Sequence, residues 1–79
     1  MNPRVTVVSP LENYHLEIHF DNGERREFDV MPYLEKGIFQ ELKNKSYFNQ
    51  VKASSGTVEW PHGQGFCPDM LFEDSKVLA

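Results

Sequence analysis

One stretch in the first half of the chain most constrains the fold, because it predicts two strands joined by a tight turn. Leu16, Ile18 and Phe20 alternate with polar residues, which is the period of a strand with one buried face. Phe28 and Val30 continue the alternation after the turn. A slip of one residue would turn every apolar side chain to water, so this pattern also fixes the pairing of the strands.

The turn between these strands contains Asn22 and Gly23, a pair typical of two-residue hairpin loops. Such a loop would place apolar side chains opposite charged ones. A three-residue loop over residues 21–23 instead sets Leu16 opposite Phe28, and its left-handed last position suits glycine. We therefore predict the three-residue loop. On the apolar face this loop also sets Tyr14 opposite Val30. The outer face then pairs His15 with Asp29, Glu17 with Glu27 and His19 with Arg25.

Composition restricts the class of protein. The 79 residues predict a single domain over 1–79. Cys67 is the only cysteine, so no internal disulfide can form, which favours a reducing cytoplasm over secretion. No apolar run approaches the length of a membrane span. The formal net charge of −4 argues against a nucleic-acid partner, because phosphate binding needs a cationic surface.

The remaining chain predicts further short elements around the hairpin. A strand at Val5–Val8 precedes it, and helical turns over residues 31–49 follow, with Pro32 at a first helical position and Gly37 as a stop. A second hairpin is expected at residues 51–60, then a last helix starting at Pro68, and a frayed tail over 73–79. The order β-β-β-α-β-β-α predicts an α+β domain: a small antiparallel sheet with short helices packed on one face.

The predicted core is mainly aromatic and aliphatic. In the helical block, Asn44 is expected to end one turn and Ser46 to cap the next. The spacing of Ile38 and Leu42 predicts that both face the sheet. The block is expected to lay these residues on the sheet: Tyr33, Leu34, Ile38, Leu42 and Phe48. The residues expected to carry the structure are Leu16, Ile18, Phe20, Phe28, Leu42, Phe48, Trp60 and Leu71.

Three residues near the end of the chain could form a catalytic or ligand-binding site. His62, Cys67 and Asp69 lie within eight positions, and a thiol near a helix N-terminus can act as a nucleophile if a base is close. The simpler interpretation is a small residue packed beside the last helix, because no oxyanion site or orienting third group is evident. We expect no enzyme activity and no cofactor.

Other patterns have weaker chemical meaning. His15 and His19 share a strand face but lack the other ligands a zinc site needs, and we expect no metal. The loop from Gly63 to Gly65 lacks the lysine of a phosphate-binding loop. Uncovered strand edges at Val5–Val8 or at Thr57–Trp60 could recruit a partner strand or a second copy. A basic region that could dock a protein partner is formed by Lys36, Lys43, Lys45 and Lys52.

The order of several short motifs resembles a small bacterial family of unknown function, the domain-of-unknown-function family 2442. The motifs are Pro3-Arg4-Val5, the hairpin, Gly37-x-Phe39-x-x-Leu42, Trp60-Pro61-x-Gly63 and Pro68-Asp69-x-Leu71. The signature positions are Phe20, Gly23, Phe28, Trp60, Pro61, Gly63, Pro68 and Leu71. The resemblance implies an α+β fold similar to the N-terminal domain of an uncharacterised Nitrosomonas protein. It establishes no catalytic residues, and where Gly65 stands the family usually carries an acidic residue.

The resemblance also implies a function, because members of this family often neighbour another small protein in a toxin–antitoxin pair. We therefore expect a non-enzymatic protein-binding module, with an antitoxin-like role beside a cognate toxin. The first alternative is a small ligand-binding or catalytic domain that uses the loop of His62, Cys67 and Asp69. The second is a DNA-binding regulator, which the acidic charge disfavours.

Overall fold

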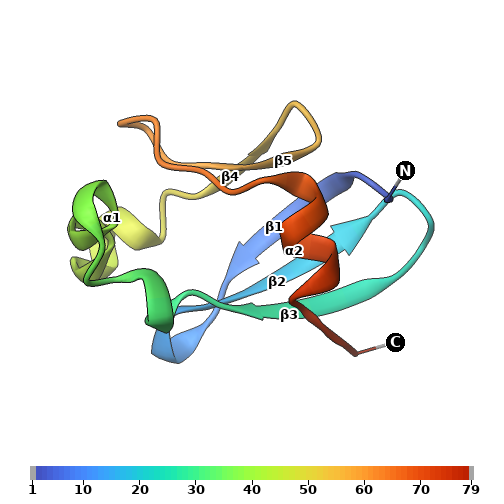
Figure 1. The fold of residues 1–79 in the computed structure, drawn as a ribbon, viewed down its shortest axis with the longest axis horizontal. Helices are drawn as coiled ribbons and strands as arrows, with labels where there is room; N and C mark the ends of the chain where they lie inside the picture. The colour runs from blue at the N-terminus through green and yellow to red at the C-terminus, as the bar shows by residue number, and fades with distance from the viewer. Residues whose placement is uncertain (1, 79) are drawn as a thin grey trace.

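The computed structural model describes residues 2–78 and contains two antiparallel sheets. The larger sheet has the strand order β1-β2-β3-β6, and the smaller one pairs β4 with β5. The strands are β1 (Val5–Pro10), β2 (His15–Phe20), β3 (Arg25–Asp29), β4 (Lys52–Ser54), β5 (Thr57–Glu59) and β6 (Lys76–Val77). The helices are η1 (Glu12–Tyr14), η2 (Met31–Tyr33), η3 (Gly37–Lys43), α1 (Lys45–Phe48) and α2 (Pro68–Glu73). This confirms the α+β class, with α2 and the β4–β5 hairpin on one side of the larger sheet (Figure 1).

The β2–β3 hairpin has the predicted register. Leu16 lies opposite Phe28, and all three polar pairs of the outer face are those expected. Gly23 closes the loop with a φ of +89° and donates its N–H to the carbonyl of Phe20 (3.0 Å). Arg25 Nε lies 3.6 Å from Glu17, and this pairing offsets the repulsion between Glu17 and Glu27.

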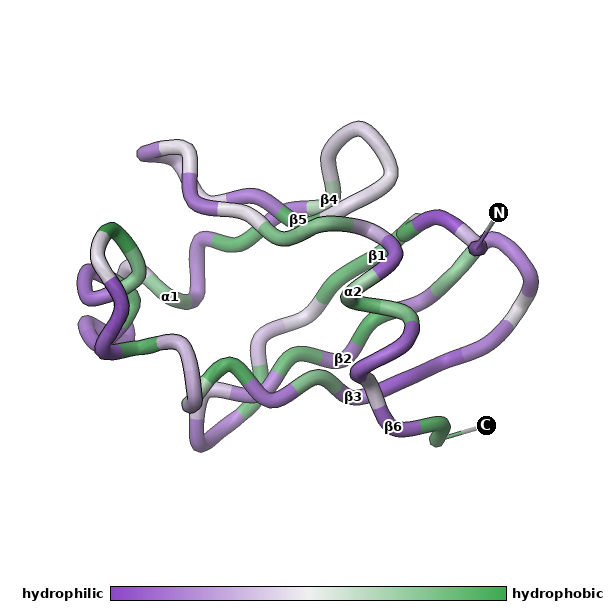
Figure 2. The backbone as a smooth tube through the Cα atoms, in the orientation of Figure 1, coloured by the Kyte–Doolittle hydropathy of each residue, from purple (hydrophilic) through white to green (hydrophobic). Residues whose placement is uncertain are grey.

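The core lies between the larger sheet and the elements that cover it. All eight residues expected to carry the structure are at most 3% exposed. Aromatic rings join the layers: Phe20 of β2 meets Phe72 of α2 edge to face (5.2 Å), and Phe28 meets Phe66 in the same geometry (5.2 Å). The apolar residues of β1 and β2 are visible as green segments beneath α2 in Figure 2.

The prediction that Ile38 faces the sheet is wrong, because its side chain is 65% exposed. The prediction assumed an α-helical period, in which residues four apart share a face. Residues 37–43 instead form a 3₁₀ helix, η3, with three residues per turn. Phe39 and Leu42 therefore share the inner face, where Leu42 is fully buried and Phe39 packs against the core.

The cap of the next helix also differs from the prediction. Asn44, not Ser46, is the N-cap of α1, and its Oδ1 accepts the backbone N–H groups of Ser46 (3.0 Å) and Tyr47 (3.3 Å). Asparagine is a strong N-cap residue, and an extended backbone at Asn44 lets one residue end η3 and start α1.

The expectation of a frayed tail is wrong for the described residues. Glu73 belongs to α2, and Lys76–Val77 form β6, which pairs with Arg26 and Glu27 of β3. Ala79 lies outside the described residues. Arg26 explains why the tail is held in place. Its side chain lies on the inner face and stacks on the Phe72 ring (3.8 Å). It also donates to the carbonyls of Phe72 (2.9 Å) and Ser75 (3.5 Å).

Candidate functional site

The loop after β5 is a tight turn with a defined shape. Trp60 donates its backbone N–H to the carbonyl of Gln64 (2.9 Å), and Gly63 donates to the carbonyl of Trp60 (2.9 Å). Gly63 has a φ of +95°, which favours glycine. Trp60 anchors the turn: its ring is fully buried and its indole N–H donates to the carbonyl of Phe48 (2.9 Å).

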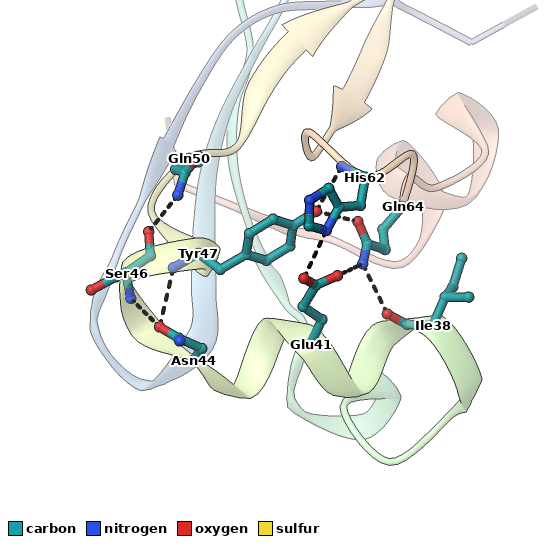
Figure 3. A network of polar contacts seen from close by, with 8 residues as sticks. All are labelled: Ile38, Glu41, Asn44, Ser46, Tyr47, Gln50, His62 and Gln64. Carbon is teal, nitrogen blue, oxygen red and sulfur yellow. Dashed lines mark hydrogen bonds and ion pairs between the residues drawn. The ribbon is translucent and has the colours of Figure 1, made fainter.

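Gln64 is the one polar side chain that is buried among the described residues, with 2% exposed. Its amide nitrogen donates to the Ile38 carbonyl (3.0 Å) and to Glu41 Oε1 (3.0 Å). Its amide oxygen accepts from the Tyr47 hydroxyl (2.6 Å). Figure 3 shows how this amide joins η3, α1 and the loop. A fully satisfied buried network of this kind makes the local geometry rigid.

Tyr47 and Glu41 hold the tip of the loop. The Tyr47 hydroxyl accepts the backbone N–H of His62 (2.8 Å), and the two rings lie 5.1 Å apart. His62 Nδ1 lies 2.7 Å from Glu41 Oε2. The hydrogen bonds from His62 and then from Gln64 lower the pKa of Glu41, so this carboxylate is ionised at neutral pH. Because an ionised carboxylate only accepts, Nδ1 of His62 is the donor in this hydrogen bond.

The network presents two side chains to solvent. Ile38 is the most exposed large apolar residue described, and the His62 side chain is 65% exposed. Both are attached to fixed points: Gln64 binds the Ile38 carbonyl, while Glu41 and Tyr47 hold His62 (Figure 3). We call the surface formed by Ile38, Glu41 and His62 the loop platform.

The structure does not join the three residues of the predicted catalytic site. His62 contacts Glu41 and Tyr47, and within residues 2–78 no hydrogen bond or ion pair links it to Cys67 or Asp69. Cys67 is an exposed free thiol at the N-cap of α2, and Asp69 lies in the first turn of that helix. Glu41 is the orienting group for His62 that sequence analysis missed, because it lies 21 positions away.

The two other histidines lie on the outer face of the sheet, apart from the loop platform. His15 contacts Glu27 and lies 3.3 Å from Asp29, and His19 lies 3.1 Å from Glu17. Within the described residues there is no group of three or more side chains that could hold a metal ion.

The predicted basic region is divided among local partners. Lys43 pairs with Glu35, Lys36 lies over the Tyr33 ring and Lys45 over the Tyr14 ring. Most of these charges are thus engaged within the chain, and they do not form a uniform cationic surface.

Gly65 lies where a side chain would be crowded. It forms a bridge with Glu59 of β5, and a Cβ atom at this position would lie 3.0 Å from the Val58 carbonyl oxygen. A side chain here would need a shift of the backbone.

Two shallow hollows lie elsewhere. One, of about 250 Å³, is lined by residues of η1 and α1, including Tyr14 and Lys45. The other, of about 310 Å³, runs along β5 from Ser54 to Phe66. Neither is lined by His62, Cys67 or Asp69.

No helix within residues 2–78 combines the length and the apolar character that crossing a membrane requires.

Comparison with known proteins gives a family and no function. Residues 5–76 match the family DUF2442, described as a protein of unknown function. No curated protein and no solved structure matches significantly. The match spans most of the chain, including the hairpin, the loop platform and α2. The chain therefore belongs to the DUF2442 family.

Proposed function

We propose that this protein is a non-enzymatic protein-binding module that acts in the cytoplasm as the antitoxin-like partner of a small toxin. The observation that carries the proposal is the loop platform, where exposed Ile38 and His62 are held by a buried polar network. The antitoxin role rests on the resemblance to DUF2442 members that neighbour small toxins. The exposed free thiol of Cys67 is compatible with a reducing compartment.

The rigid support favours binding over a purely structural role for the loop. A flexible surface loses conformational entropy when a partner binds, and an ordered one loses less. Gln64 and Tyr47 support the loop from below, so the backbone of Ile38 and the backbone of His62 are held in place by hydrogen bonds in the free protein. A hot-spot residue is one that packs fully against the partner and is shielded from water by its neighbours, and exposed Ile38 can act as such an anchor.

The chemistry of the loop platform indicates what the partner supplies. The Ile38 side chain needs an apolar contact that removes it from water. The His62 ring offers a polar contact, and the ionised Glu41 carboxylate that holds it favours a cationic group such as lysine or arginine. A net charge of −4 adds long-range attraction to a basic partner.

The test is co-expression with the product of the adjacent gene, followed by affinity purification and titration calorimetry. We expect a stable complex that Ile38→Ala and His62→Ala each weaken about 10-fold or more, which is the effect of losing a hot-spot residue. The matched controls are Val7→Ala, which is 51% exposed on the outer sheet face, and His19→Ala on the same face. Both controls should leave the affinity unchanged.

Two results would contradict the proposal. If no complex forms with the adjacent gene product, the antitoxin role fails. If a complex forms but is insensitive to Ile38→Ala and His62→Ala, the loop platform is not the contact surface.

A further inference from the structure

Most strand edges in this protein are blocked, which is how proteins limit edge-to-edge pairing. Val5 of β1 donates its outward N–H to the carbonyl of Gly56 (2.9 Å), and β4 lies beside β1. Further along β1, the outward-facing position opposite Leu16 is Pro10, which has no N–H to offer. The free side of β5 is bridged by Gly65.

The edge at β6 is different. No strand within residues 2–78 pairs with its free side, because β6 is the last strand in the order β1-β2-β3-β6. Leu78 donates its N–H to the carbonyl of Arg25 (2.8 Å), and Lys76 lies opposite Glu27. Backbone groups alternate in direction along an antiparallel strand, so the N–H and C=O of Val77, between these two residues, point away from β3.

The side chains at this edge are apolar as well as accessible. Val77 is 54% exposed and Leu78 is 39% exposed. The end of β6 is one of the green segments at the periphery of the molecule in Figure 2. An apolar edge with free backbone groups is a template for another strand.

We propose that β6 pairs antiparallel with β6 of a second copy of this chain, so that two four-stranded sheets become one continuous sheet. Val77 lies on the two-fold axis. The Val77 N–H of each copy donates to the Val77 carbonyl of the other copy, so the pair exchanges two hydrogen bonds. The interface is isologous, with the same residue on both sides.

The register follows from the strand itself. We place Val77 on the axis because the backbone groups of its neighbours Lys76 and Leu78 are directed to β3, whereas those of Val77 point outward. Centring the pair on Val77 sets Lys76 opposite Leu78 of the other copy, so the two lysines do not face each other. Val77 then meets Val77 on the inner face, a favourable β-branched pair.

The proposed interface is small, so association is expected to be weak and dependent on concentration. Stable dimers usually bury about 1,200–2,000 Å² in total, and a short edge strand buries less. The contact uses neither Ile38 nor His62, so it is independent of the proposed toxin-binding function.

The experiment is sedimentation velocity on the full chain over a range of concentrations. Wild type should shift from monomer to dimer as concentration rises. Val77→Lys and Val77→Asp should each remain monomeric, because like charges then meet on the axis. An equimolar mixture of the two variants should dimerise. Val7→Lys is the matched control: it makes the same change at an equally exposed valine on the opposite edge strand, and should dimerise like wild type.

Two further measurements keep the test decisive. Trp60 fluorescence reports whether each variant is folded, and exchange of the Leu78 amide reports whether β6 stays on β3. A monomeric wild type at every concentration, or dimers that survive both Val77 substitutions, would overturn the proposal. A mixture that stays monomeric would overturn the two-fold register. Binding of the adjacent gene product should persist in Val77→Lys, which separates this proposal from the function proposed above.

Discussion

The buried amide of Gln64 allows a quantitative test of the network beneath the loop platform. In Gln64→Leu the side chain keeps a similar volume but loses three hydrogen bonds. The Tyr47 hydroxyl loses its acceptor and the Ile38 carbonyl loses the donor from Gln64. A buried polar group left unpaired costs about 1–3 kcal/mol, and the added apolar burial offsets part of that. We expect Gln64→Leu to lower the free energy of unfolding by about 2–4 kcal/mol.

Tyr47→Phe probes the same network from the other side. It removes the hydroxyl, so the Gln64 amide oxygen and the His62 N–H lose their partner. We expect a cost of about 1–3 kcal/mol. The double variant removes both ends of the Tyr47–Gln64 hydrogen bond, and no unpaired group is left at that contact. Its cost should therefore fall short of the sum of the single costs by about 0.5–3 kcal/mol.

The assay is equilibrium urea unfolding followed by Trp60 fluorescence and far-UV circular dichroism. A chain of 79 residues has an expected stability of about 4–12 kcal/mol, so the differences are measurable. Gln40→Leu is the matched control, because the Gln40 amide makes only an exposed contact with the Glu35 carbonyl; it should change stability by less than about 0.5 kcal/mol. Additive costs in the double variant, or a Gln64→Leu protein as stable as wild type, would refute the reasoning.

Two further predictions concern the same region. Trp60→Ala should cost about 3–5 kcal/mol, because a fully buried ring is replaced by a cavity, and an unchanged thermal midpoint would contradict this. The lowered pKa of Glu41 stabilises the fold above the ordinary glutamate value of about 4.3, and this contribution is lost as pH falls through the lower folded value. The urea midpoints of wild type and Glu41→Gln should therefore differ at neutral pH and converge in acid. If the difference between the two midpoints were the same at every pH, the proposed contribution of Glu41 ionisation to stability would be refuted.

The hairpin was predictable because a period of two leaves one register that buries its apolar residues. That register also implies that Arg26 shares the inner face with Ile18, although the sequence alone does not suggest that α2 offers it carbonyl partners. Ile38 was misplaced because a 3₁₀ period cannot be told from an α-helical one over two turns.

The candidate site was less predictable than the fold. His62 was found from its residue type, but its partner Glu41 comes from a distant helix. Gln64 lies between two glycines in a polar loop, and no local pattern indicates that it is buried. The β6 strand is too short to show alternation. These features depend on tertiary contacts, which sequence periodicity does not encode.

The shortness of the covering helices constrains the order of folding. The longest α-helix described, α2, has six residues, and η2 and α1 are single turns. Helices of this length do not persist alone in water. The β2–β3 hairpin, by contrast, is closed by a local turn and needs little chain entropy to nucleate. We therefore expect the strands to assemble before the helical turns acquire their shape, and the loop platform to be among the last parts of the chain to form.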